Sequence, residues 1–323
     1  MSASGTASAV NPHPERVVDS DRVWTTLITN LDYLSGLLTL DYTLKQQNSR
    51  YPLVALYTDT FPESGLAALR ARNIPYKKIP YLLPATPKDF SNDPRFYDCW
   101  SKLTPFSLTE YVRVCQLDSD MLVLRNMDEL LSDDSLLDDA SLNGQGQKVF
   151  AASHACVCNP LKKPHYPRDW IPENCAFTSQ HGIPDKAQTV GAPPTAGLAM
   201  PNGGLQVVVP NAAVYERITS ALGSDLTANY EFADQSMLGD LFRGRWVALP
   251  YIYNALKTLR WKGVHDAIWR DDQVKNVHYI LSPKPWDEKG EERGKSDETH
   301  AWWWRETEDR FAAEKKSGVY DGI

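Results

Sequence analysis

Apolar positions follow two different periods along the chain, and its first eighty residues show both. The run V-W-T-T-L-I-T at 23–29 is rich in β-branched residues and predicts a buried strand, which ends at Asn30, a residue that can cap a helix. Apolar side chains then recur at helical spacing, at Leu34, Leu37, Leu38 and Tyr42. A strand at 53–57, a helix from Pro62 to near Asn73 and a short strand at 76–79 follow. Strands that alternate with helices indicate βαβ units and a largely parallel sheet.

The rest of the chain continues this alternation. We expect a short helix at 105–111, a strand at 112–117 and a second apolar run at 121–124, with the acidic triplet Asp118-Ser119-Asp120 between the last two. Further strands are predicted at 149–152, 205–209, 246–249 and 274–279, and helices at 212–222 and 234–242. The pattern predicts an α/β fold with a mixed, mostly parallel central sheet flanked by helices. Ligands of such sheets bind outside the carboxyl ends of the strands, where the triplet lies.

Three regions are expected along the chain. Residues 1–20, rich in Ser, Ala, Gly and Pro, predict a disordered leader, and residues 21–290 a single catalytic domain. A segment at 154–201, dense in Pro, Cys, His and Gly, interrupts that domain, and structureless segments of this length are usually functional or disordered. Residues 291–323 form a charged tail in which Trp302, Trp303 and Trp304 are expected to begin a helix, and we expect these tryptophans to dock it on the core.

Composition excludes several classes of function. The chain has 323 residues, of which 42% are hydrophobic and 23% charged, which is typical of a folded enzyme-sized protein. Its formal charge of −7 offers no basic surface for nucleic acid. No apolar run reaches the length of a membrane span. Five cysteines, two of them as Cys156-x-Cys158, and the lack of any N-x-S/T site favour a reduced, cytoplasmic location.

The acidic triplet carries the first candidate chemistry. A diphosphate leaving group needs its charge neutralised, and a divalent cation does this as a Lewis acid. Hard cations prefer oxygen ligands, so Asp118 and Asp120 at a strand end can hold one. A D-x-D triplet on its own is more often a solvated acidic turn.

A second motif favours a metal site over a solvated acidic turn. His278 closes the last predicted strand and is followed by Lys284 within K-P-W. A neutral imidazole can complete a mixed oxygen and nitrogen metal shell, and lysine can reach phosphate as a point charge. The two motifs together predict a metal site for a diphosphate.

The chain resembles glycosyltransferase family 8, the family of glycogenin and galactinol synthase, from about Val23 to Trp286. The motifs that carry the resemblance are T-L-I-T-N-L-D-Y, L-K-Q-Q, S-K-L-T-P-F-S-L-T-E-Y, D-S-D, L-V-L-R-N-M-D-E-L-L, N-G-G, A-D-Q, L-P-Y-I-Y-N and H-x5-K-P-W, in this order. The resemblance implies a GT-A (Rossmann-like) fold and a retaining transferase that moves a hexosyl group from a UDP-sugar with Mn²⁺ or Mg²⁺. It leaves the acceptor open between a small molecule and a glycan, and it is compatible with a homodimer.

The resemblance also assigns residues. It implies that Leu27, Thr29, Asn30 and Tyr33 hold uracil and ribose, and that Lys102 contacts the donor. It implies that Asp118, Ser119, Asp120, His278 and Lys284 bind the metal and diphosphate, with Asp118, Asp120 and His278 as metal ligands. Asn202, Asp234 and Gln235 match positions at the sugar and acceptor site. Asn202 is also typical of a turn, and Asp234 of a helix N-cap.

Two features depart from the pattern. The family usually has glycine three residues after the histidine, where its backbone approaches the diphosphate, and this chain has Leu281 instead. The Cys and His residues of 154–201 are irregularly spaced, so we favour a loop that covers the acceptor pocket over a zinc site.

Two other functions stay open. A sugar nucleotidyltransferase also uses a doubly wound sheet and a metal, but it needs a glycine-rich loop after the first strand, which this chain lacks. A nucleotide-sugar-binding protein without turnover is the other alternative.

Overall fold

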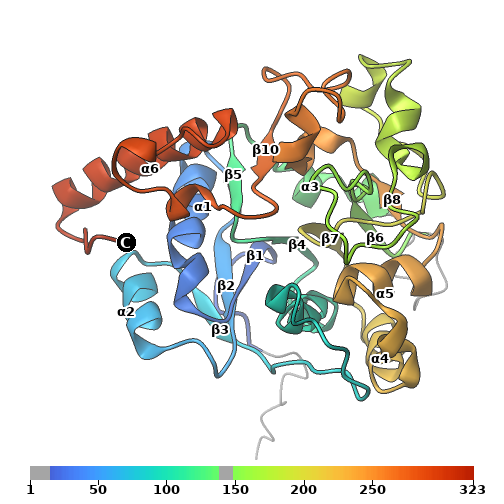
Figure 1. Ribbon diagram of the computed structural model, residues 1–323. Helices are drawn as coiled ribbons and strands as arrows, with labels where there is room; N and C mark the ends of the chain where they lie inside the picture. The colour runs from blue at the N-terminus through green and yellow to red at the C-terminus, as the bar shows by residue number, and fades with distance from the viewer. Residues whose placement is uncertain (1–14, 138–147) are drawn as a thin grey trace, which may run out of the picture.

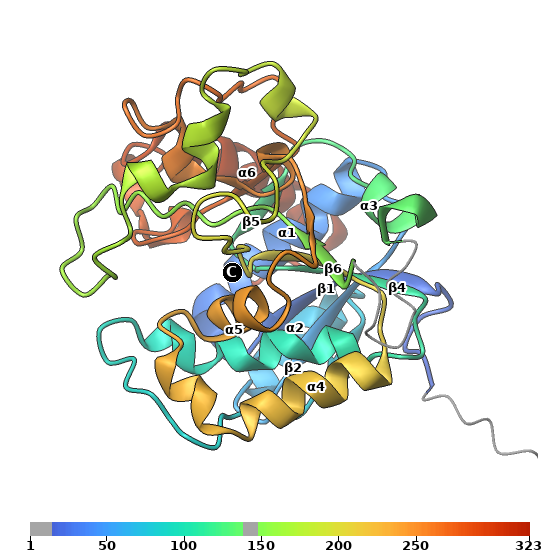
Figure 2. The ribbon, with the colours of Figure 1, turned by 90° about the vertical axis from the view of Figure 1, so that its right-hand side faces the viewer.

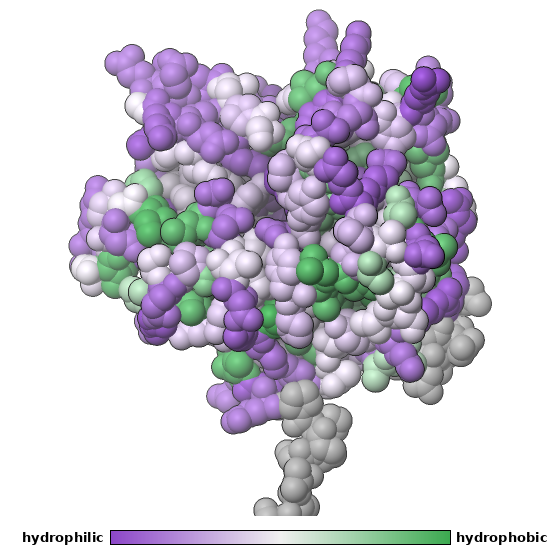
Figure 3. Space-filling model, turned by 60° about the horizontal axis from the view of Figure 1, so that its bottom comes forward, coloured by the Kyte–Doolittle hydropathy of each residue, from purple (hydrophilic) through white to green (hydrophobic). Residues whose placement is uncertain are grey.

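A computed structural model describes residues 15–137 and 148–323. Most of the predicted leader, residues 1–14, lies outside this range, and residues 15–21 contain no helix or strand. In the part of the chain that is described, no helix is long and apolar enough to cross a membrane. On the face shown in Figure 3, hydrophobic residues lie in small groups among hydrophilic ones.

A mixed, mostly parallel sheet forms the centre of the fold, which confirms the predicted α/β class. Among the described residues it has seven strands in the order β3-β2-β1-β4-β7-β6-β8. Their bounds are β1 (Arg22–Ile28), β2 (Leu53–Tyr57), β3 (Tyr76–Lys78), β4 (Arg113–Leu117), β6 (Phe150–Ala152), β7 (Leu205–Val208) and β8 (Val247–Ala248). The strands from β3 to β4 run parallel, β7 is antiparallel to both of its neighbours, and β8 is parallel to β6.

Helices cover both faces of this sheet (Figures 1 and 2). One face carries α1 (Leu34–Gln46) and α2 (Glu63–Ala71), and α6 (Glu298–Ser317) packs on α1. The other carries α4 (Ala212–Leu222), α5 (Ala233–Leu241) and the 3-10 helix η3 (Cys99–Ser107). Successive residues of β1 and β2 point to opposite faces, as the pleat of a strand requires, so both strands are buried on both sides.

A second, three-stranded sheet lies beside the first and brings the histidine motif to the acidic triplet. It consists of β5 (Met121–Val123), β10 (Asn276–His278) and β9 (Ala255–Leu256), with β10 in the middle. In its antiparallel register with β5, His278 lies opposite Met121, the residue after Asp120. The sequence predicted β5 and β10 but neither their pairing nor β9. A short helix α3 (Glu129–Ser132) follows β5.

The predicted helix at 105–111 is wrong, and the prediction of a structureless segment at 154–201 needs correction. The helical turns run from Cys99 to Ser107, because Trp100, Leu103 and Phe106 recur every third residue and form one buried 3-10 face. Short 3-10 turns lie in the second segment, at Pro172–Asn174, Ala176–Gln180 and Lys186–Gln188. Its Trp170, Cys175, Phe177 and Ala187 belong to a buried cluster.

The docking predicted for the C-terminal tail is confirmed by its tryptophans. Trp303 and Trp304 are buried in the same cluster as Trp170 and Phe177, and Trp304 donates its indole N–H to the carbonyl of Pro285 at 3.0 Å. The tail therefore holds the segment after β10 in place.

Helix α1 approaches the acidic triplet so closely that one position along it must be glycine. A Cβ added at Gly36 would lie well inside contact distance of the Ser119 carbonyl oxygen and 2.7 Å from the ring of Trp286. The Ser119 oxygen belongs to the backbone and cannot turn aside. Gly36 thus sets how near α1 lies to the turn between β4 and β5.

We expect Gly36→Ala to lower the free energy of unfolding by about 1–3 kcal/mol, the usual cost of overpacking. This loss should outweigh the gain of about 1 kcal/mol in helix propensity. Gly223→Ala is the matched control, because Gly223 follows α4 with negative φ and its added Cβ would meet nothing nearer than 3.5 Å. Urea denaturation measures both variants, and a Gly36→Ala protein as stable as Gly223→Ala would contradict the close-approach argument.

Candidate active site

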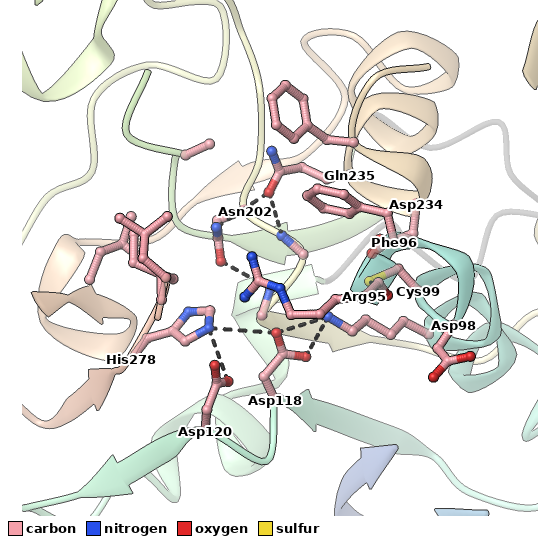
Figure 4. A pocket seen from close by; sticks show the side chains of 18 of the residues that line it. Arg95, Phe96, Asp98, Cys99, Asp118, Asp120, Asn202, Asp234, Gln235 and His278 are labelled. Carbon is pink, nitrogen blue, oxygen red and sulfur yellow. Dashed lines mark hydrogen bonds and ion pairs between the residues drawn. The ribbon is translucent and has the colours of Figure 1, made fainter. Parts of the chain in front are cut away.

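A pocket opens where the carboxyl ends of β1, β4 and β10 meet (Figure 4). It contains almost every site residue that the sequence singled out, and Lys284 lies directly behind Asp120. The predicted residues that line it are Leu27, Thr29, Asn30, Tyr33, Lys102, Asp118, Ser119, Asp120, Asn202, Asp234, Gln235 and His278. The structure therefore brings together residues that are up to 257 positions apart in the sequence, from Leu27 to Lys284.

The acidic turn is tied to the strands on both sides of it. The amide of Asp118 donates to the carbonyl of Gly204 at 2.8 Å, and the carbonyl of Asp120 accepts from the amide of Tyr279 at 2.9 Å. The Ser119 hydroxyl donates to the carbonyl of Leu27 at 3.0 Å. Because every residue of the triplet is bonded to a different part of the chain, the two carboxylates have a fixed separation and direction.

Backbone amides fix which nitrogen of His278 faces the acids. The amide of Gly204 donates to Asn202 Oδ1 at 3.0 Å, so this atom is the oxygen, and Asn254 Nδ2 donates to it at 2.8 Å. Asn254 Oδ1 is then an acceptor, and it lies 2.9 Å from His278 Nδ1. The Nδ1 atom therefore carries a proton, and Nε2 is the atom that faces Asp118 and Asp120.

The three side chains form a set of donor atoms that suits a divalent cation. His278 Nε2 lies 3.2 Å from Asp120 Oδ1 and 3.6 Å from Asp118 Oδ2, and one ligand atom from each residue lies within 4.8 Å of the others. A histidine bonded through its other nitrogen is the usual arrangement of a metal ligand. Two carboxylates and one imidazole leave further coordination positions on a Mn²⁺ or Mg²⁺ ion free. The residues therefore fit the metal that the sequence predicted.

Two lysines balance the charge of the acids. Lys102 Nζ lies 2.7 and 2.8 Å from the two oxygens of Asp118, and Lys284 Nζ bonds to Asp120 Oδ2 and to the carbonyl of Tyr279. Burial alone would raise the pKa of Asp120, but Lys284 and His278 outweigh it and hold that pKa well below its usual range. Burial alone would lower the pKa of Lys102, and Asp118 raises it well above its usual value. Burial lowers the pKa of Lys284, and the charge of Asp120 opposes that shift.

The loop after His278 keeps the backbone conformation that glycine favours. Leu281 has φ of +66°, in the left-handed region where side chains are uncommon. The departure from the family pattern therefore changes the side chain at this position without moving the backbone into the extended or right-handed region. Lys284 still reaches Asp120.

At one end of the pocket, the residues that the sequence assigned to uracil and ribose surround the end of β1. Asn30 accepts the amide of Asp32 at 3.0 Å, which confirms its predicted capping role, and its Nδ2 donates to Thr29 Oγ1. Thr29 Oγ1 in turn donates to Asp98 Oδ2 at 2.6 Å. Tyr33 packs its ring edge-on against Trp286, with centroids 5.7 Å apart.

Amide side chains occupy the opposite end. Gln235 Oε1 accepts from the amide of Gly203 at 3.2 Å and from Asn202 Nδ2 at 3.3 Å, so its Nε2 is the donor left over, and it lies 3.2 Å from the sulfur of Met200. The predicted N-cap role of Asp234 is wrong, because Phe232 is the N-cap of α5 and Asp234 lies within the first turn, buried against the pocket.

Sequence reasoning missed several residues of the pocket. Arg95 forms a bidentate pair with Asp93, with contacts of 2.7 and 2.6 Å, and lines the pocket together with Asp98 (Figure 4). Nothing in their sequence context signals this role. Asn254 ends the L-P-Y-I-Y-N motif, so the sequence singled it out, but the sequence did not predict its contact with His278. The aromatic wall beyond Gln235 was missed as well, and it consists of Phe96, Tyr166, Trp170 and Phe232.

No protein-family model matches the chain. Among characterised proteins, galactinol synthase 1 of Arabidopsis thaliana is 27% identical over 302 residues, which cover 90% of this chain and 78% of the relative. Galactinol synthase 1 of Solanum lycopersicum is 28% identical over 276 residues, with 83% and 74% covered. These similarities confirm the resemblance that the motifs indicated.

Solved structures agree on the fold. The galactosyltransferase LgtC in complex with donor and acceptor sugar analogs superposes with a TM-score of 0.54 at 16% identity, over 89% of this chain and 96% of that one. The apo form of the glycosyltransferase GlyE of Streptococcus pneumoniae gives 0.55 at 18% identity, over 92% and 64%. The chain therefore has the GT-A fold and is a glycosyltransferase related in sequence to the galactinol synthases.

Proposed function

We propose that this glycosyltransferase transfers a hexosyl group from a UDP-sugar, with Mn²⁺ or Mg²⁺ as cofactor and with retention of configuration. The observation that carries the proposal is the convergence of Asp118, Asp120 and His278 at the floor of one pocket. Candidate nucleoside residues lie at one end of that pocket and hydroxyl-binding amides at the other. Retention follows from the resemblance to family 8.

The donor lies across the acidic turn in this proposal. Uracil and ribose occupy the end formed by Leu27, Thr29, Asn30 and Tyr33, and the diphosphate reaches the metal ligands. The cation, when bound, neutralises the charge that builds up on the leaving diphosphate. Lys102 and Lys284 add two positive charges at the same place, and Lys102 exchanges one of its Asp118 contacts for a phosphate oxygen.

The hexose then faces Asn202, Asp234 and Gln235. Amide groups and a carboxyl group both donate to and accept from sugar hydroxyls. We propose that the acceptor, a small molecule or a glycan, stacks on the aromatic wall beyond them, where Trp170 and Phe232 lie parallel with centroids 4.1 Å apart. Because the relatives are named galactinol synthases, a polyol is the first acceptor to test.

Asp234 adds a protonation state to this end of the pocket. Burial raises the pKa of Asp234 to about 7, with a further contribution from Asp118 that Lys102 partly opposes. Asp234 is 2% exposed, and Gln206 Nε2 donates a long hydrogen bond to its carboxyl group at 3.4 Å. Near neutral pH it can therefore present a hydroxyl donor to a sugar as well as an acceptor.

The two alternatives are weaker. A sugar nucleotidyltransferase would need glycine-rich backbone after β1, and the segment there is Thr29-Asn30-Leu31-Asp32-Tyr33. A binding protein without turnover is less favoured because the relatives of this chain are named as synthases. We also propose a cytoplasmic location, from the five free thiols, and no nucleic-acid partner, and we leave a homodimer as a hypothesis.

We expect UDP-sugars with Mn²⁺ to raise the melting temperature and GDP-sugars to have little effect. A ligand at a hundredfold excess over its Kd adds about 2.7 kcal/mol to the free energy of unfolding, which is readily measured by thermal shift. UDP-Glc, UDP-Gal and UDP-GlcNAc, with GDP-Man as control, would test this. A larger shift with GDP-Man would overturn the assignment of the nucleoside end.

Asp120→Asn should leave the protein folded and lower the rate of nucleotide release on the order of a thousandfold or more, because one ligand charge is lost. Excess Mn²⁺ should restore little of this activity, and a chelator should silence the wild type. Asp225→Asn, which changes an exposed aspartate outside the pocket, is the control and should be fully active. Normal turnover of Asp120→Asn, or of the wild type in chelator, would contradict the metal role.

Asp234→Asn should be more stable than the wild type above pH 7. The carboxyl pKa is about 7 in the folded state and 3.8 in the reference state, so between these values the folded protein holds a proton that the unfolded chain has released. Stability of the wild type therefore falls as pH rises from about 4 to 7, by a few kcal/mol in all. The variant lacks this loss, so denaturation at pH 5 and pH 8 should show its advantage growing with pH. An equal difference at both values would contradict the raised pKa.

A further inference from the structure

Three cysteines and a histidine meet at a second place in the molecule, apart from the acidic triplet. Cys156 and Cys158 follow β6, Cys175 lies between two 3-10 turns of the 154–201 segment, and His265 comes from the loop after β9. One ligand atom from each lies within 4.8 Å of the other three. Figures 1 and 2 both show the yellow-green segment beside the orange one that carries His265.

The distances in the cluster match a tetrahedral site. His265 Nε2 lies 3.1 Å from Cys158 Sγ and 3.3 Å from Cys175 Sγ. Zinc to sulfur bonds of about 2.3 Å place the ligands of a tetrahedron roughly 3.8 Å apart, so the four atoms need only small shifts to surround one ion. No other group of three or more cysteine, histidine or acidic residues among the described residues is arranged in this way, apart from the triplet with His278.

The three thiols and His265 face one another and bond mainly among themselves. His265 Nδ1 lies 2.8 Å from Nε2 of His181, and with the proton on Nδ1 this bond leaves a single lone pair on His265 Nε2. The sulfur atoms of Cys158 and Cys175 both lie within hydrogen-bond distance of this nitrogen, and the thiol of Cys156 lies beside them. A metal ion, in contrast, accepts electron pairs from all four atoms. A ligating histidine bonded through its other nitrogen is also the typical outer arrangement of a zinc site.

We infer that Cys156, Cys158, Cys175 and His265 bind a structural Zn²⁺ ion. Three thiolates and an imidazole are soft to borderline ligands that favour zinc, unlike the oxygen-rich set at the acidic triplet. All four positions are filled by protein, and Cys175 and His265 are 3% and 0% exposed, so the site is closed and has no place for a substrate.

The site joins a wall of the pocket to the body of the protein. Cys156 lines the pocket itself, and so do its neighbours Ala155, Asn159 and Pro160. The segment that carries them contains only isolated 3-10 turns, so backbone hydrogen bonds hold it weakly. Zinc would link two parts of this segment, at Cys156/Cys158 and at Cys175, to His265 in the loop at 261–268. The free energy of metal binding then contributes directly to folding.

Metal analysis of the full chain tests the inference. The protein is purified without an immobilised-metal column, under reducing conditions, and its zinc is measured by mass spectrometry and by release to a chromogenic chelator after a mercurial is added. We expect about one zinc per chain. Cobalt(II) in its place should give the intense thiolate charge-transfer and tetrahedral d–d bands of a sulfur-rich site.

Two variants separate this site from the others. Cys175→Ser should lose the zinc, whereas Cys115→Ser, which removes a buried thiol in β4, should keep it. Asp120→Asn should also keep the zinc, because its ligands are different. If Cys175→Ser does not fold, the zinc content and the cobalt spectrum of the wild type still decide.

Three results would overturn the inference. One is a reduced protein, with five titratable thiols, that neither contains zinc nor takes it up. Another is a disulfide between Cys175 and Cys156 or Cys158, found by mass spectrometry after alkylation without reductant. The third is zinc that is lost in Asp120→Asn but retained in Cys175→Ser, which would place the ion at the acidic triplet.

Discussion

Two carboxylates held side by side, with Asp120 buried and Asp118 half-buried, are the constraint on which the rest of the structure depends. Asp118 and Asp120 repel each other, and burial strengthens that repulsion because the local dielectric constant is low. The chain compensates with Lys102 from η3 and with His278 and Lys284 from the last strand and its loop. Removing Lys102 would leave Asp118 without its lysine partner, and removing Lys284 would leave Asp120 without its own. Three distant segments are thereby forced to fold together around one turn.

The same turn shows what the sequence could predict. The strand before it, the helix α4 and the place of the triplet at a strand end follow from apolar periodicity, because each is a local pattern. His278 and Lys284 stood out as a second motif at the end of a predicted strand, and the resemblance to family 8 supported both. Neither source could supply Arg95, since its part in the pocket depends on the path of an irregular loop and on its pairing with Asp93. The two-residue strand β9 is too short to leave a periodic signal.

The cysteine cluster is a site that sequence reasoning argued against and that the tertiary fold brings together. The irregular spacing of Cys156, Cys158 and Cys175 counted against zinc, because regular spacing is expected only where all the ligands come from one short motif. The fourth ligand atom comes from His265, 90 residues after Cys175, and no feature of the sequence around it marks it as a ligand. Of the histidines nearer in sequence, His154 bonds to the carbonyls of Ala192 and Pro193, and His181 reaches the cluster only through His265. Only the tertiary fold could choose among them.

The two candidate metal sites differ in the way that their positions require. The oxygen-rich site has only three protein ligands, which in the proposed function leaves coordination positions for phosphate oxygens. The sulfur-rich site stands behind the pocket wall, where a closed shell prevents exchange and resists the flexibility of a segment without strands. If both ions bind as proposed, one fixes a wall of the pocket and the other completes its floor. The irregular segment would then be held in place by the zinc ligands rather than by strands or long helices.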